Sequence, residues 1–266
     1  EINLLVLNAS NLLWKLPPRD FFDSVSQPIE VGQSLSIAEI KEILQRSGFD
    51  RVAVVHDPGQ YAVRGSIVDL CSPSEIHPIR IDLDDDHVDS IRLFDSASQL
   101  TIKQIKKTWI IPANQFPRDS KAVDFFKTNM RNHFEGNQME WPLYNYIYDD
   151  PENHGVYSYL PLFYNTMSSL LDYIDPSTRI FLIDDFASSL LDFKQLIDQR
   201  FNDYQLDTQP IMQPNELFFN ANKIIDEINQ KTLFTVQTEK LTGTNKQQLI
   251  NFDTQPLLLE TSDISL

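Results

Sequence analysis

Carboxylates and arginines are the side chains of this sequence whose spacing could support chemistry. Aspartates crowd between residues 82 and 89, and Arg64 and Arg80 stand close to them along the chain. A calcium loop places acidic ligands at alternating positions and needs glycine at position 6 and a bidentate glutamate at position 12. Counted from Asp82, those two positions hold His87 and Leu93, so the calcium loop fails. We expect a charged turn between two strands instead.

A second carboxylate pair, Asp184 and Asp185, follows the apolar run Ile180–Ile183. This has the form of a Walker B strand, whose carboxylates hold the magnesium of a bound nucleotide. Its necessary partner, the phosphate-binding string GxxxxGK[ST], does not occur among the seven glycines. The strings HExxH, GxSxG, CxxC and GxGxxG are also missing. We therefore expect a degenerate Walker B-like strand, no enzyme centre, and neither a metal site nor a cofactor in these residues.

The two arginines are candidates for partner binding. An exposed arginine pair on a sheet offers rigid bidentate forks for the carboxylates of a partner. We place Arg64 and Arg80 on adjacent predicted strands. The alternative is a cross-strand ion pair, in which the hairpin register sets Arg80 opposite Asp69. Whether Arg64 shares that face depends on a bulge at Gly65, so both interpretations stay open.

The arginines and the aspartate cluster lie in a region dominated by strand patterns. Ser36 and Glu39 form a capping box that predicts a helix ending near Gly48. A short strand is expected before that helix, and several after it, at residues 28–31, 51–55, 61–70, 78–83, 87–94 and 105–111. One helix against an antiparallel sheet makes a small α+β unit.

After Pro112 the pattern changes to longer helical periods. An amphipathic stripe predicts one helix through Ala122, Val123, Phe126 and Met130. Residues 135–159 have no period and predict a long loop, followed by a short helix to Tyr173. Strand 180–183, helix 186–201 and strand 233–236 predict an α/β layer, and Ile2–Leu7 predicts a further buried strand.

Composition limits the possible functions. With 22 Lys and Arg against 38 Asp and Glu, the net charge is −16 and the pI is near 4.6, so direct nucleic-acid binding is disfavoured. The length suits about two domains. One cysteine favours a reducing compartment, and no apolar run is long enough to span a membrane. We expect a cytoplasmic chain without membrane contact, and because it begins at Glu1 without a leader we treat it as a fragment.

Several strings, in order, resemble one family. They are GQYAVRGSIVDLCSP at 59–73, PIRIDLDDDHVDSIRLFD at 78–95, IIPANQFP at 110–117, YLPLFY at 159–164 and LDY at 171–173. Together they are similar to the form GEYAxRGxxxDxFP…xRxDFFxDxIDSxRxFD, with downstream LLPAxEFP and YxxPLFF…LFDYL, of bacterial transcription-repair coupling factors. The resemblance covers roughly residues 2–185, and the excision-nuclease subunit UvrB has a similar layout.

The resemblance implies a multidomain α/β and α+β fold. Residues 1–17 would end the first part of a helicase-like α/β domain, 18–112 would be a small inserted α+β domain that docks on UvrA, and 113–266 would be the returning part of the helicase-like domain. Arg64 and Arg80 match two family positions that contact UvrA. A third, aromatic position falls on Asp84, which is a departure and is not carried over.

The function implied is recruitment of UvrA to stalled RNA polymerase by a non-catalytic interaction module. The parent protein would be an ATP-dependent DNA translocase that uses ATP and Mg and reaches RNA polymerase and DNA through other domains. Contact between this module and the parent's C-terminal domain is also expected, and it could mask the UvrA-binding surface. The alternative from another class is a UvrB-like ATP-dependent helicase subunit whose P-loop lies outside these residues.

Overall fold

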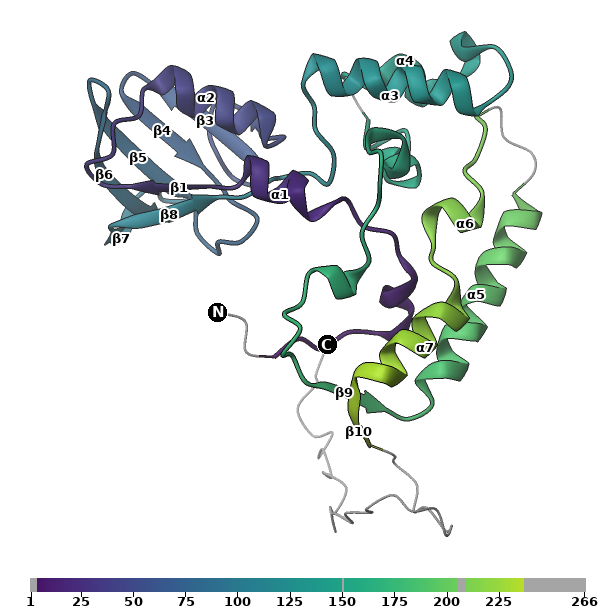
Figure 1. Ribbon diagram of the computed structural model, residues 1–266. Helices are drawn as coiled ribbons and strands as arrows, with labels where there is room; N and C mark the ends of the chain where they lie inside the picture. The colour runs from purple at the N-terminus through teal and green to yellow at the C-terminus, as the bar shows by residue number, and fades with distance from the viewer. Residues whose placement is uncertain (1–3, 150, 205–208, 237–266) are drawn as a thin grey trace, which may run out of the picture.

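The computed structural model describes residues 4–149, 151–204 and 209–236. Figure 1 shows a β-sheet with helix α2 lying over it, and next to it a region of helices that also contains short strands. The chain is therefore a mixed α/β structure with several small sheets. Buried side chains of the described residues gather in separate hydrophobic clusters, a large and a small one in the sheet region and two in the helical region.

The sheet region is built from antiparallel hairpins, as the alternating pattern predicts. Its largest sheet has the order β2-β3-β4-β5-β6-β7, with β2 parallel to β3 and every later neighbour antiparallel. The strands are β2 (Asp50–Arg51), β3 (Gln60–Arg64), β4 (Ile67–Leu70), β5 (Ile79–Asp84), β6 (His87–Phe94) and β7 (Thr101–Ile105). Two more strands, β1 (Gln27–Glu30) and β8 (Lys107–Ile110), pair with each other.

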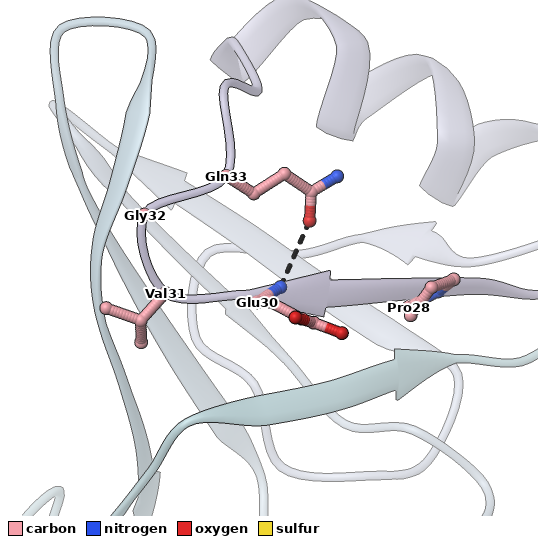
Figure 2. A pocket seen from close by; sticks show the side chains of 5 residues that line it. All are labelled: Pro28, Glu30, Val31, Gly32 and Gln33. Carbon is pink, nitrogen blue, oxygen red and sulfur yellow. Dashed lines mark hydrogen bonds between the residues drawn. The ribbon is translucent and has the colours of Figure 1, made fainter.

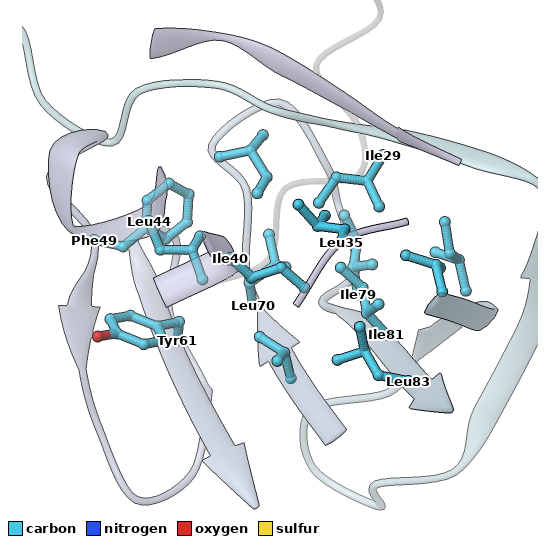
Figure 3. Packing of buried hydrophobic residues seen from close by; sticks show 14 residues of the cluster. Ile29, Leu35, Ile40, Leu44, Phe49, Tyr61, Leu70, Ile79, Ile81 and Leu83 are labelled. Carbon is cyan, nitrogen blue, oxygen red and sulfur yellow. The ribbon is translucent and has the colours of Figure 1, made fainter. Parts of the chain in front are cut away.

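Helix α2 (Ile37–Arg46) covers one face of this sheet. Ile40 and Leu44, both fully buried, project from the helix into the cluster that also holds Val68 and Ile81 of the sheet (Figure 3). The predicted capping box is confirmed, since the Glu39 backbone N–H donates to Ser36 Oγ at 3.3 Å and the Ser36 backbone N–H donates to Glu39 Oε2 at 2.8 Å.

Loss of the capping box should destabilise the sheet region measurably. We expect Ser36→Ala to lower the free energy of unfolding by about 1 kcal/mol, because one helix N–H then loses its acceptor. Urea unfolding followed by circular dichroism measures this, with Ser66→Ala in an exposed turn as the control. Equal midpoints for the two variants would contradict the prediction.

Residues 61–70, expected as one strand, form a hairpin. β3 and β4 are joined by the turn Gly65-Ser66, and Gly65 has a φ of +60°, which glycine adopts without strain. The turn shifts the alternation by one residue, since Val63 before it and Val68 after it face each other in the same core. Strand-forming residues on both sides of so short a turn made the segment look like one strand. The expected strand at 51–55 is also shorter, as β2 ends at Arg51.

The region expected to be a loop, 135–159, is largely folded. It contains the 3-10 helix η2 (Gln138–Glu140), α4 (Pro142–Tyr146) and the start of η3 (Val156–Phe163). These pack on α3 (Ser120–His133), which confirms the predicted amphipathic helix, and Phe126 stacks on Phe163 with ring centroids 4.4 Å apart. The loop prediction was wrong because irregular, aromatic segments bury side chains without a helical or strand period.

The predicted α/β layer is present at the other end of the chain. Strands β9 (Ile180–Ile183) and β10 (Thr232–Val236) are parallel, and between them run α5 (Phe186–Asp203), α6 (Pro214–Leu217) and α7 (Ala221–Lys231). Of the strand expected at 2–7, residues 2 and 3 lie outside the described residues, and for residues 4–7 the prediction was wrong, since they form no strand and have exposed side chains. No helix among the described residues is long and apolar enough to cross a bilayer.

Two connections join the sheet region to the rest of the described chain. The first, residues 14–18, precedes α1 (Arg19–Val25) and includes an isolated bridge between Leu16 and Ser168. The second is residues 112–117. Both contact residues 164–173, because Tyr173 donates its hydroxyl to the Pro17 carbonyl and Tyr164 donates to the Gln115 carbonyl, each at 2.6 Å. The 3-10 helices η1 (Ala9–Leu13) and η4 (Leu170–Asp172) flank these contacts.

These tyrosines should make the fold sensitive to alkaline pH. Burial raises the pKa of Tyr173 to about 12 and raises the pKa of Tyr164 further, whereas a tyrosine in the unfolded chain titrates near 10. Their contribution to stability is therefore complete below pH 10 and is lost as the pH rises through the folded-state value. We expect a steep loss of thermal stability between pH 10 and about 12, and a shallower one in Tyr164→Phe/Tyr173→Phe. Identical pH profiles for the two proteins would exclude this role.

Candidate functional site

The polar face of the six-stranded sheet carries the arginines. Side chains alternate along β5, so Ile79 and Ile81 enter the core below α2 while Arg80 projects from the opposite face. The ladder registers place further charged side chains there. We call the group Arg64, Asp69, Arg80, Asp82 and Arg92 the arginine face.

Arg80 is held by contacts in several directions. Its Nε donates to Asp69 Oδ1 at 2.7 Å, and its Nη2 donates to Asp69 Oδ2 at 2.9 Å and to Gln99 Oε1 at 3.0 Å. Its guanidinium carbon lies 4.4 Å from the centre of the Phe94 ring. The hydrogen bond to Asp69 raises the pKa of Arg80. Arg80 is therefore a positively charged group with a fixed position.

Arg64 shares the same carboxylate but is held more loosely. Its Nη2 donates to Asp69 Oδ2, and no other hydrogen bond or ion pair of its side chain occurs within the described residues. The exposed fraction of the side chain is 49% for Arg64, 16% for Arg80 and 1% for Asp69. Two cations thus converge on one buried anion, which leaves positive charge facing solvent.

The cross-strand ion pair between Arg80 and Asp69, which was the alternative to partner binding, is observed. Arg64 lies on the same face of the sheet as Arg80. Asp69 lies opposite Arg80 in the ladder, and Ala62 lies opposite Asp69, which makes Arg64 its diagonal neighbour. The turn at Gly65, and not a bulge, sets this register. The expectation that the two arginines occupy adjacent strands was wrong, because β4 lies between them. The ion pairs with Asp69 leave part of the guanidinium groups of Arg64 and Arg80 accessible to a partner. The partner-binding hypothesis remains a prediction.

Arg92 is a member of this face that sequence reasoning missed. It lies directly opposite Arg80 on β6, and its Nη2 donates to Asp82, which also accepts from Ser90 Oγ at 2.8 Å. Its Nε is buried and has no hydrogen-bond partner among the described residues. Pairing residues outward from the turn at Asp85 would have placed β6 beside β5, but the register shift between Asp82 and Leu83 displaces the pairing by one residue. Simple counting therefore does not place Arg92 opposite Arg80.

The aspartates at the end of β5 form a turn, as expected. Asp85 has a φ of +51°, and Asp84 pairs with His87 where β6 begins. Asp84, which stands at the aromatic position of the resemblance, is exposed. Groups of three or more potential metal ligands do not occur within the part of the chain that the structure describes.

The second carboxylate pair lies between β9 and α5, away from the arginine face (Figure 1). Asp185 is the N-cap of α5, and its Oδ1 accepts a hydrogen bond from the Ser188 backbone N–H at 3.0 Å. Asp184 has a φ of +55°, and its backbone N–H donates to the Val236 carbonyl at 2.8 Å. The pair therefore shapes the strand-to-helix turn, and its designation as a degenerate Walker B-like site stays a prediction.

A pocket at the end of β1 is separate from the arginine face. Its lining residues are Pro28, Glu30, Val31, Gly32 and Gln33 (Figure 2). The Glu30 backbone N–H donates to Gln33 Oε1 at 3.0 Å and so closes the turn at Gly32, where φ is +86°. The pocket is therefore the concave side of the turn that follows β1.

Comparisons with known proteins place the arginine face in a family context. Residues 28–116 match the family described as "UvrB interaction domain". The chain is similar to the transcription-repair-coupling factor of Rickettsia bellii (strain RML369-C), with 33% identity over 246 residues, 89% of this chain and 22% of that protein. The transcription-repair-coupling factor of Haemophilus influenzae is 28% identical over 247 residues, which are 92% of this chain and 22% of that protein. That of Escherichia coli K12 is 26% identical over 240 residues, which are 90% of this chain and 21% of that protein. The chain thus spans about a fifth of the length of these relatives.

Proposed function

We propose that this chain, which is homologous to the transcription-repair-coupling factors and contains a UvrB interaction domain at residues 28–116, is a non-catalytic module that recruits UvrA. Recruitment would take place during transcription-coupled nucleotide-excision repair. RNA polymerase, DNA and an ATP-driven translocase activity would belong to other parts of the parent protein.

The arginine face is the observation that carries this proposal. Arg64 and Arg80 lie within the matched residues and meet on one buried carboxylate, so their guanidinium groups are neutralised only in part. A planar guanidinium held on a rigid strand is suited to a carboxylate of a protein partner. The net charge of −16 for the whole chain makes this positive face a local exception and favours a protein partner over DNA.

The finer domain layout is part of the proposal. Residues 18–112 would be a small domain inserted between two parts of a helicase-like α/β domain, 1–17 and 113–266. The parallel pair β9 and β10, with α5 and α7 in the same cluster, supports the α/β assignment. Exposed apolar side chains on these strands, Ile183 and Val236, fit an incomplete sheet. A degenerate ATPase strand in this position is consistent with an interaction role.

A binding assay against purified UvrA tests the proposal. The immobilised chain should capture UvrA, and Arg64→Ala/Arg80→Ala should abolish capture. The matched control is Arg46→Ala/Arg51→Ala, which removes the same charge from exposed positions outside the arginine face. Capture that persists in the arginine-face variant, or disappears equally in the control, would refute the assignment.

A further inference from the structure

We propose that Asp69 is a positioning residue that holds Arg64 and Arg80 in the conformation in which they meet carboxylates of the partner. The inference rests on the proposed function and deepens it, because it assigns a role to a residue that the partner cannot touch. The Asp69 side chain is 1% exposed and therefore acts on a partner only through the arginines.

The position of Asp69 in the ladder makes the double contact possible. β4 lies between β3 and β5, so a side chain on its polar face has neighbours on both sides. Arg80 lies directly opposite on β5. On the β3 side the opposite residue is Ala62, whose small side chain leaves the diagonal path open for Arg64. The two oxygens of one carboxylate accept from both arginines.

A purely stabilising ion pair would not require this arrangement. Arg80 alone gives Asp69 a bidentate partner and satisfies a buried carboxylate. Arg64 adds a second cation that neutralisation does not need, and half of its side chain stays in solvent. Because Asp69 is already paired with Arg80 and the Arg64 side chain is half exposed, the second contact adds little to stability. The contact between Arg64 and Asp69 is therefore better explained by the orientation it gives to an exposed guanidinium.

The two arginines are restrained to different degrees. Arg80 is fixed by Asp69, by Gln99 and by the Phe94 ring, and Gln99 itself sits at a φ of +61° in its turn. Arg64 depends on Asp69 alone within the described residues. Without that carboxylate, Arg64 samples many rotamers, and a partner must order it on binding. Loss of Asp69 should therefore affect binding chiefly through Arg64.

The experiment measures UvrA binding kinetics for Asp69→Asn in the full chain, with folding checked by circular dichroism. We expect affinity to fall about tenfold, consistent with the cost of ordering one or two long side chains. Asp50→Asn, which removes one negative charge from an exposed side chain on the same sheet, should bind within about twofold of wild type. The energetic coupling between Asp69→Asn and Arg64→Ala separates a positioning role from a general loss of stability, because a loss of stability alone would not produce it. In an Arg64→Ala background, Asp69→Asn should cost much less than in wild type.

A second pair of variants covers the case in which Asp69→Asn does not fold. Arg80→Met keeps Asp69 for Arg64, whereas Arg80→Met/Asp69→Asn removes the buried anion and cation together and leaves neither uncompensated. The double variant should bind UvrA more weakly than Arg80→Met. Suppose that the arginine variants lose UvrA binding as expected. The inference on Asp69 is then overturned if Arg80→Met and Arg80→Met/Asp69→Asn bind UvrA equally, or if the effects of Asp69→Asn and Arg64→Ala are additive. If the arginine variants themselves keep full UvrA binding, the proposed function fails and this inference fails with it.

Discussion

Replacing Arg64 or Arg80 by alanine should weaken UvrA binding by about 2–5 kcal/mol each, almost entirely through faster dissociation. Truncating one member of a desolvated charge pair leaves the partner's carboxylate buried without its cation, and that penalty appears in the off-rate. The arginine face supplies the geometry for such pairs, because both guanidinium groups converge on Asp69 and keep positive charge at the surface. Surface plasmon resonance at fixed ionic strength measures both rate constants.

The two variants should differ in stability even where they agree in binding. Arg80→Ala leaves the buried Asp69 with one exposed partner and should cost about 1–3 kcal/mol of folding free energy. Arg64→Ala removes a half-exposed cation and leaves Asp69 paired with Arg80, so it should cost no more than about 1 kcal/mol. Binding losses that simply track thermal stability, with Arg64→Ala binding like wild type, would show that the face is structural and has no role in recognition.

Core truncations should reveal whether residues 18–112 unfold separately. Ile81 is fully buried under α2, so Ile81→Ala should destabilise the sheet region by about 2–5 kcal/mol. Phe126 is equally buried, and its replacement by alanine should destabilise the helical region by about 3–5 kcal/mol. If the sheet region is a domain of its own, each change lowers one unfolding transition and leaves the other in place.

Tryptophan fluorescence can follow the two regions separately. Trp109 lies on β8 beside the sheet, and Trp141 is buried in the helical cluster. Chains that retain Trp109 or Trp141 as their single tryptophan, with Trp14 also replaced, should report different urea midpoints. Ile81→Ala should move only the midpoint reported by Trp109. A single transition shared by both tryptophans, moved by either truncation, would contradict the boundary at 18–112.

Local signals predicted much of the fold correctly. The capping box at Ser36 and the apolar stripe through Phe126 each depend on residues within one or two helical turns. Both helices could therefore be predicted from the local sequence alone. The alternation along β5 also determines which side chains reach the polar face, and that placed Arg80 there. The parallel strands β9 and β10 were predictable because each is a short apolar run followed or preceded by a helix.

Features set by distant contacts were not predictable in the same way. The turn at Gly65 is only two residues long and has strand-forming residues on both sides, so β4 and the true separation of Arg64 and Arg80 were missed. Arg92 required a register that shifts within the β5–β6 hairpin. Residues 4–7 of the expected strand at 2–7 are not a strand, because an apolar run becomes a strand only where a neighbouring strand pairs with it.

The two connections to the sheet region have a mechanical consequence. A region attached at one point can swivel freely, whereas attachment at two points on one short segment removes rotation about the linker axis. Tyr173 and Tyr164 provide those two points, and Leu171, between them, is packed in the cluster that includes α5 and α7. The two hydrogen bonds therefore restrain the orientation of the sheet region relative to residues 164–173 and to the cluster of α5 and α7 on which they pack.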